Sequence, residues 1–301
     1  MNLKASYPQL YPPNSDVKSH YNKITHQWKQ SSRQESIVYH LKCLQNFIKT
    51  CLLEKYIPML QKFSHVLDLC GGKGGDLTKY THFPFISHVT LADISDESIN
   101  ESIEKYKKLN RPSFTFNTIV LDAWKPNEFF SSLSYDIVIC HFALHYACVN
   151  EATLEQTFLN IQQCLKPGGL FIFTVPNSQE IQKFKNNNIC QIEFKKATVT
   201  FENFTPYSFS LVDSVQNCVE YLVPSYDFMK LLGEKHDLKL LESQSFKNYS
   251  VSCVKNNMNL AQKMKVIDYS HISLLTKEEE NVSNLYDFYV FQKKKIELKP
   301  N

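Results

Sequence analysis

Four of the seven glycines in this 301-residue chain fall within five positions, and this cluster restricts the fold more than any other sequence feature. The stretch "VLDLCGGKGGDLTKY" (66–80) places Gly71, Gly72, Gly74 and Gly75 directly after an apolar run. A simple tight turn needs one or two glycines, where φ is positive. A strand, a glycine-rich turn and a helix bring backbone N–H groups close to a ligand at the start of the helix. We therefore predict a nucleotide-type ligand at this turn.

The rest of the chain alternates between strand and helix patterns. Apolar runs predict strands at 65–69, 88–94, 114–123, 135–144, 170–176, 238–246 and 285–292. Helical spacing predicts helices at 36–57, 74–80, 95–110, 151–165 and 225–237. We expect Ser95 or Asp96 to cap the third of these helices, and "KPGG" (166–169) to stop the fourth before the next strand begins. Continuous apolar strands that alternate with helices indicate a largely parallel sheet covered on both faces.

The expected domain organisation is simple. Residues 1–15 are polar and proline-bearing and predict a flexible tail, 16–293 a single domain, and 294–301 a basic C-terminal end. Between 179 and 224 the helix–strand rhythm gives way to alternating residues typical of antiparallel strands. We expect this segment to be an insertion that helps to close the acceptor site.

Composition excludes several classes of protein. The longest apolar runs fall well short of the roughly 18 residues of a membrane span, so we expect no membrane partner. The nine cysteines are scattered without a CxxC pair, which predicts a reducing compartment and no metal. A net charge of +3 does not by itself indicate a nucleic-acid-binding protein, although the segment around Arg33 is locally basic.

The residues at the glycine turn limit the ligand. "CGGKGG" does not match GxGxxG, and a Walker loop would need GKS or GKT. Asp76, directly after the glycines, would repel a pyrophosphate but would suit a cationic group such as an amino-acid ammonium. Asp68, on the first strand, adds a second carboxylate there.

Two further carboxylates end the next strands. Asp93 lies about twenty residues beyond the glycines, where an acidic side chain commonly binds ribose hydroxyls, or it caps the following helix. Asp122 is placed to accept from an adenine amino group. Ribose, adenine and an α-amino acid together describe S-adenosylmethionine. The prediction is therefore a Rossmann-like α/β fold of the class I methyltransferases.

Six motifs then resemble one family, the mRNA cap guanine-N7 methyltransferases, over roughly residues 20–292. "VLDLCGGKGGDL" resembles the family's VLDLGCGKGGDL, and "HFALHYA" (141–147) is similar to QFALHYSF. "LKPGGLFIFTVPNS" (165–178) resembles LxPGGYFIxTxPNS. "HYN" (20–22), "QNFIK" (45–49) and "YSFSLVDSVQNCVEYLVP" (207–224) resemble further motifs in family order.

The resemblance implies roles for matching positions. For the methyl donor it implies Lys49, Asp68, Cys70, Gly72, Asp76, Asp93, Asp122 and His141. For the cap it implies Tyr21, Asn22, Phe142, His145, Tyr146, Pro176, Tyr207, Glu220 and Tyr286. The expected reaction transfers methyl from S-adenosylmethionine to guanine N7 and leaves S-adenosylhomocysteine. Because N7 carries a free lone pair and no proton, no general base and no metal are expected.

Other interpretations stay open at this point. Phe142 and Tyr286 suit a hydrophobic core, His145 suits a structural histidine, and Glu220 can pair with a lysine such as Lys230. Cys70 stands where the family has a small residue, and His141 where it has glutamine. A methyltransferase for another acceptor, or a non-catalytic cap-binding subunit, is therefore an alternative.

The resemblance also implies partners and a location. The expected partner is the capped 5′ end of RNA, with recruitment by the RNA polymerase II tail or by other capping enzymes left open. We expect a monomer in the nucleus.

Overall fold

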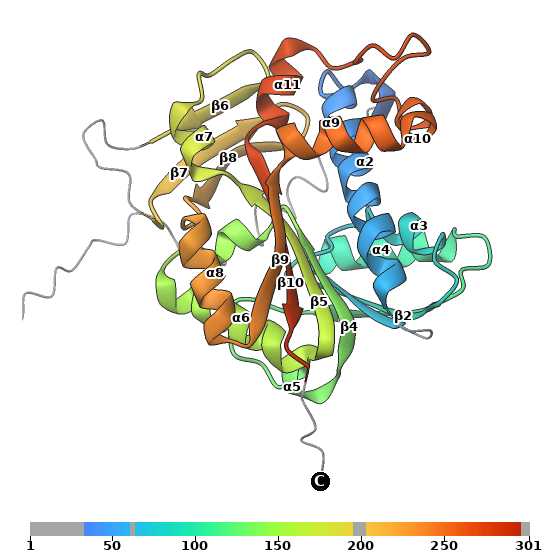
Figure 1. Ribbon diagram of the computed structural model, residues 1–301, viewed down its shortest axis with the longest axis vertical. Helices are drawn as coiled ribbons and strands as arrows, with labels where there is room; N and C mark the ends of the chain where they lie inside the picture. The colour runs from blue at the N-terminus through green and yellow to red at the C-terminus, as the bar shows by residue number, and fades with distance from the viewer. Residues whose placement is uncertain (1–32, 61–63, 195–202, 296–301) are drawn as a thin grey trace, which may run out of the picture.

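The computed structural model describes residues 33–60, 64–194 and 203–295 of the chain. Its centre is a seven-stranded sheet in the order β3-β2-β1-β4-β5-β10-β9 (Figure 1). Its strands are β1 (Ser64–Leu69), β2 (Ile86–Asp93), β3 (Thr115–Val120), β4 (Tyr135–His141), β5 (Leu165–Pro176), β9 (Leu238–Ser245) and β10 (Tyr286–Lys293). The first five are parallel, and β10 runs antiparallel to both β5 and β9. The prediction of a largely parallel α/β sheet is confirmed.

Helices cover both faces of this sheet (Figure 1). On one side lie α2 (Tyr39–Tyr56), α3 (Leu77–Tyr80), α4 (Asp96–Lys107) and α9 (Phe246–Asn256). On the other lie α5 (Phe129–Ser132), α6 (Glu151–Cys164) and α8 (Tyr226–Lys235). Alternate strand residues point to opposite sides, so Val66 and Ile137 join one core while Leu67 and Val138 join the other. The continuous apolar strands of the sequence follow from this two-sided burial.

A second, smaller sheet lies in the segment where antiparallel strands were predicted. It contains β6 (Cys190–Glu193), β7 (Pro206–Leu211) and β8 (Val215–Tyr221), paired antiparallel in that order, which confirms the predicted strand type. The short helix α7 (Ser178–Lys183) leads into it. Figure 1 shows this sheet beside α7, above α8. It brings β8 towards the carboxyl ends of the main strands, through contacts with the 3-10 helix η3 (Leu144–Ala147).

Several predicted boundaries were wrong. The strand predicted over 135–144 ends at His141, because Phe142 adopts φ of 56°, and the strand predicted over 114–123 ends at Val120. Two further boundaries differ because of a glycine. The helix expected from residue 74 begins only at Leu77, because Gly72 and Gly74 adopt φ of 53° and 66°, outside the helical region. "KPGG" ends α6 but lies within β5. Leu165 pairs with Tyr135 and the register resumes at Leu170, so the extra residues, with Gly168 at φ 80°, form an irregularity in the strand.

The helical segment between β9 and β10 was not predicted. It contains α10 (Met258–Lys263) and α11 (Lys277–Ser283) after α9. Serine and asparagine weaken the apolar periodicity of α9. A signal for α11 was present, since Thr276 and Glu279 form a capping box. Elsewhere, Ser95 is the N-cap of α4 and accepts from Ser98 N–H, which settles the choice between Ser95 and Asp96.

The remaining described elements are short 3-10 turns: η1 (Arg33–Glu35) and η2 (Ile57–Met59). No helix in the described ranges has the length and apolar character needed to cross a membrane.

Candidate functional site

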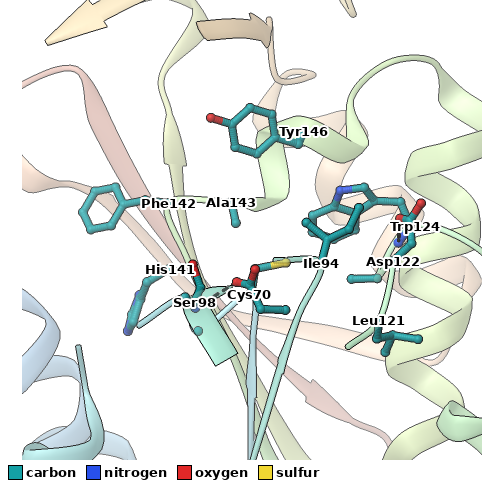
Figure 2. A pocket seen from close by; sticks show the side chains of 14 residues that line it. Cys70, Ile94, Ser98, Leu121, Asp122, Trp124, His141, Phe142, Ala143 and Tyr146 are labelled. Atoms are coloured by element: carbon teal, nitrogen blue, oxygen red, sulfur yellow. Dashed lines mark hydrogen bonds between the residues drawn. The ribbon is translucent and has the colours of Figure 1, made fainter. Parts of the chain in front are cut away.

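A cavity of about 250 Å³ opens at the carboxyl ends of β1, β2 and β4 (Figure 2). Parallel strands of an open α/β sheet bind ligands at this edge. The lining residues include five of the predicted donor positions and two of the predicted cap positions. They are Cys70, Gly71, Gly72, Asp93, Ile94, Ser98, Leu121, Asp122, Ala123, Trp124, His141, Phe142, Ala143 and Tyr146.

Asp93 is fixed by the turn and the helix on either side of it. Its Oδ2 accepts from the Gly72 N–H at 2.8 Å and its Oδ1 from the Ser95 N–H at 2.9 Å. Burial raises the pKa of Asp93, while these backbone donors act in the opposite direction. The carboxylate is thereby held in one orientation at the cavity wall, able to accept from ligand hydroxyls. The helix cap predicted as its alternative role belongs to Ser95.

Asp122 lines the far end of the cavity beside Trp124 (Figure 2). Its Oδ1 accepts from the Trp124 N–H at 3.2 Å, and its Oδ2 lies 2.9 Å from Lys125 Nζ. Trp124 and Ile94 were not predicted as site residues. Ile94 is one position after Asp93 and Trp124 is two positions after Asp122, so their places after the strand-end carboxylates could have predicted them.

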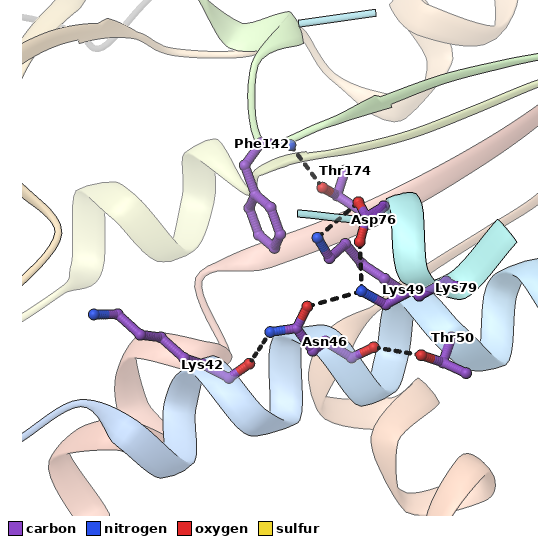
Figure 3. Close-up of polar contacts among 8 residues, drawn as sticks. All are labelled: Lys42, Asn46, Lys49, Thr50, Asp76, Lys79, Phe142 and Thr174. Atoms are coloured by element: carbon purple, nitrogen blue, oxygen red, sulfur yellow. Dashed lines mark hydrogen bonds and ion pairs between the residues drawn. The ribbon is translucent and has the colours of Figure 1, made fainter. Parts of the chain in front are cut away.

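Asp76 lies beside the cavity without lining it, between two lysines (Figure 3). Its Oδ2 accepts from Lys49 Nζ at 2.8 Å and its Oδ1 from Lys79 Nζ. Lys79 also donates to Asn46 Oδ1, which ties α3 to α2. Burial would raise the pKa of Asp76, but the two ammonium groups outweigh it and hold that pKa well below its usual range. Asp76 therefore carries two lysine partners that the sequence did not show, and because each carboxylate oxygen can accept a further hydrogen bond, its role towards a cationic ligand group stays a prediction.

Asp68, unlike Asp76, forms no ion pair with a lysine in the described part of the chain. It is buried on β1, and its Oδ2 has no hydrogen-bond partner within the described ranges. Burial, followed by the nearby Asp76 carboxylate, raises the pKa of Asp68 to about 7. A Cβ at Gly71 would come 2.8 Å from Asp68 Cγ, so glycine lets the cavity wall approach this side chain.

The two departures from the family motif both line the cavity. Cys70 adopts φ of 57°, a conformation that suits glycine, and its thiol contacts Cys140, which with burial raises the pKa of Cys70. His141 is half-buried, but both of its ring nitrogens are inaccessible, and neither has a hydrogen-bond partner in the part of the chain that the structure describes. Burial lowers the pKa of His141 to about 3, so its imidazole is neutral at pH 7.

A second group of predicted residues gathers around Glu220 on β8, which is only 5% exposed. Tyr207, paired with it on β7, donates its hydroxyl to Glu220 Oε2 at 2.7 Å. His145 Nε2, from η3, lies 3.4 Å from Oε1. The surface ion pair with Lys230 that was considered as an alternative is wrong, because Glu220 faces buried groups.

Phe142 and Tyr286 lie next to each other at the edge of this group. Their rings meet edge to face with centroids 5.1 Å apart, and Tyr286 pairs with Pro176 in the main sheet. Phe142 has φ of 56°, and its N–H donates to Thr174 O and Oγ1 (Figure 3). A non-glycine residue in this conformation is uncommon, and such strain is often found at functional sites.

The turn after β4 joins the two groups. Tyr146 lines the cavity, and its hydroxyl lies 3.2 Å from Cys218 Sγ on β8. Tyr21 and Asn22 lie outside the described residues, as does the side chain of Arg33. The arrangement offers anchored carboxylates along a cavity and, beside it, a buried carboxylate among aromatic rings. The cavity can hold a charged nucleoside, and the neighbouring group can hold a flat base that carries hydrogen-bond donors.

The fold and the cavity define a class I S-adenosylmethionine-dependent methyltransferase. A solved methyltransferase of this kind from Clostridium acetobutylicum superposes with a TM-score of 0.52 at 16% identity, over 91% of this chain and 99% of that one. The model of the mRNA (guanine-N(7))-methyltransferase domain matches residues 11–294. The chain belongs to this family of enzymes.

Two curated relatives agree with that membership. The mRNA cap guanine-N(7) methyltransferase of Caenorhabditis briggsae is 31% identical over 84% of this chain and 72% of its own length. The mRNA cap guanine-N(7) methyltransferase 1 of Oryza sativa is 30% identical over 92% of this chain and 81% of its own length. The resemblance seen in the motifs is thereby confirmed.

Proposed function

We propose that this chain transfers the methyl group of S-adenosylmethionine to N7 of the terminal guanine in GpppN-capped mRNA, releasing S-adenosylhomocysteine. The observation that carries the proposal is the position of Glu220. It lies buried beside the turn 141–146, which also lines the donor cavity. Family membership supports the same reaction.

The residues around the cavity fit the donor. Asp93, fixed by two backbone donors, would accept from the ribose hydroxyls, and Asp122, at the far end, from the adenine amino group. Asp68, with a buried oxygen that lacks a partner, would take the donor ammonium beneath Gly71. In this assignment Asp76 positions Lys49, which would face the donor carboxylate. S-adenosylmethionine, when bound, supplies a methyl group on a positively charged sulfur.

The second group fits guanine. Glu220 can accept from guanine N1–H and N2–H together, a pair of donors that adenine does not have. Tyr207 donates its hydroxyl to one oxygen of this carboxylate, and His145 Nε2 lies 3.4 Å from the other. Phe142 and Tyr286 would flank the base. Because N7 has a free lone pair, the chain needs only to align it with the methyl group and to exclude water.

The alternatives are weaker. A cap-binding subunit without turnover would not need Asp68, Asp93 and Asp122 to be kept at three strand ends. Cys70 and His141, the departures that motivated this alternative, both line the cavity. A methyltransferase for another acceptor would not need the contacts that hold Glu220.

Setting and partners are also proposals. From family membership we infer a nuclear protein that meets capped transcripts as a monomer, recruited by the RNA polymerase II tail or by other capping enzymes. A fluorescent fusion found only in the cytoplasm would contradict the location. Light scattering that gives twice the chain mass of 35.1 kDa would contradict the monomer.

The deciding experiment is transfer of labelled methyl from S-adenosylmethionine to GpppA-capped RNA, followed by nuclease digestion and product identification. We expect m7GpppA. Transfer to another position, or none despite donor binding, would favour a different acceptor. Failure to bind S-adenosylhomocysteine in calorimetry would favour the subunit without turnover.

A further inference from the structure

A second cavity, of about 470 Å³, is lined by residues of α7 and the first turn of α8, at the edge of the sheet where β5 ends and β10 begins. Figure 1 shows these elements. It meets the proposed cap site at Pro176, which lines it. Asp287 lines it as well, one residue after Tyr286, but on the opposite face of β10. The two sites therefore lie back to back across the end of one strand pair.

The lining of this cavity is aromatic and amide-rich. Tyr226 stacks on Tyr289 with ring centroids 6.4 Å apart, and Tyr226 remains 50% exposed. Side-chain amides around them come from Asn177, Gln179, Gln182 and Asn203. An exposed tyrosine supported from behind by a second ring is a platform on which a flat group can stack.

Charge decides which part of a ligand this cavity suits. No lysine, arginine or histidine is among its lining residues in the described ranges, and one carboxylate, Asp287, is. Asp287 Oδ2 accepts from Asn177 Nδ2 at 2.7 Å, whereas Oδ1 has no hydrogen-bond partner in the described part of the chain. A carboxylate repels phosphate and accepts from amino groups. The cavity is thus suited to a nucleobase and not to the sugar–phosphate backbone.

We propose that this cavity binds a base of the transcript downstream of the cap, stacked on Tyr226 and recognised by the amides and by Asp287. The inference rests on the proposed function, because it needs a capped RNA in the neighbouring site. It adds a transcript-binding subsite to the cap site and predicts that acceptors longer than the cap nucleotide gain affinity from it.

The test compares two acceptors, GTP and a capped oligoribonucleotide, in steady-state methylation by the full chain. Loss of one stacked base weakens binding by about tenfold. Tyr226→Ala should therefore raise KM for capped RNA by about tenfold, with KM for GTP and the dissociation constant of S-adenosylhomocysteine unchanged. Tyr226→Phe should restore the wild-type KM. Leu231→Ala, on the same helix and 64% exposed but outside the cavity, is the matched control.

Asp287→Asn tests the recognition of the base edge. Wild-type chain should favour capped RNA whose first residues are adenosine over one whose first residues are uridine, and this preference should shrink in the variant. Equal KM changes for GTP and RNA, or no change for RNA in Tyr226→Ala, would overturn the subsite while leaving the cap reaction intact. A wild-type chain that methylates neither acceptor would instead overturn the proposed function.

Discussion

The donor cavity and the Glu220 group are neighbours, but they are built in opposite ways. Along the cavity, Asp93 and Asp122 come from the ends of successive strands, and backbone N–H groups or a lysine hold their oxygens. Around Glu220, the contacts join side chains from segments far apart in sequence, such as 142–146, 207 and 286.

That difference has a thermodynamic consequence. Backbone donors come with the fold of the strand ends, so the donor cavity depends on secondary structure that the core already fixes. The Glu220 group depends on the small sheet docking correctly against η3 and β10. Substitutions in the second region should therefore affect the acceptor alone, whereas substitutions in the first should affect the donor.

The largest expected effect is that of Glu220→Gln. The amide replaces one of two acceptor oxygens by a donor, so a bidentate contact to guanine is lost, and kcat/KM for capped RNA should fall about 100-fold. Calorimetry should show nearly unchanged affinity for S-adenosylhomocysteine. Glu193→Gln, exposed on the same small sheet, is the control and should leave both values at wild type. Lost donor binding in Glu220→Gln would show that the two regions are not separable.

Asp93→Asn should produce the complementary result. The carboxylate loses charge where it would accept from ribose hydroxyls, and a hydrogen bond to a charged group contributes about 1.5–3 kcal/mol. The dissociation constant of S-adenosylhomocysteine should rise about tenfold or more, with KM for capped RNA near wild type at saturating donor. Asp96→Asn, on the exposed first turn of α4, controls for the loss of a nearby charge. An increase in the RNA KM alone would contradict the assignment.

A smaller expected effect is the release of a proton from Asp68 when the donor binds. With the pKa of Asp68 raised to about 7, the free protein holds this carboxyl partly protonated at neutral pH. A donor ammonium would lower that pKa, so binding should release a proton near pH 7, and affinity should increase as pH rises through about 7. Calorimetry of S-adenosylhomocysteine in two buffers of different ionisation enthalpy measures the release. It should disappear in Asp68→Asn, and a wild-type release of zero would refute the role.

The raised pKa of Asp68 also makes the free energy of unfolding depend on pH. Because the folded state binds this proton more tightly than the unfolded chain, Asp68 favours the fold at low pH, and that contribution is lost as pH rises from about 4 to about 7. Thermal unfolding of Asp68→Asn should lack this part of the pH dependence.

The smallest expected effect is that of Cys70→Gly. Cys70 adopts φ of 57°, and relief of a left-handed non-glycine residue is worth about 1 kcal/mol. The midpoint of unfolding should rise by a few degrees. Lys265→Gly, with φ of 60° on an exposed turn, should give a similar gain without touching the donor cavity. A loss of stability in Cys70→Gly alone would mean that the thiol packing against Cys140 outweighs the strain.

Sequence reasoning succeeded where the information was local. The glycine turn, the strand ending in Asp93 and the cap at Ser95 are each encoded within a few residues. It did not reveal the lysine partner of Asp76, because Lys49 is 27 positions away and its pairing is a tertiary contact. It also failed at "KPGG", which indicates that a helix stops but not that β5 already begins at Leu165, where the chain pairs with Tyr135 of β4. No local pattern marks Glu220, whose assignment came from family resemblance alone.

The turn that follows β4 belongs to both halves of the site. Phe142 and Tyr146 line the donor cavity, while Phe142 contacts Tyr286 and His145 faces Glu220. A single strained segment, held to Thr174 by the Phe142 N–H, therefore borders both of the proposed substrate sites. If occupancy of one side changes the free energy of this segment, the other side must respond. Linkage then requires reciprocity: the factor by which the donor strengthens cap binding equals the factor by which the cap strengthens donor binding.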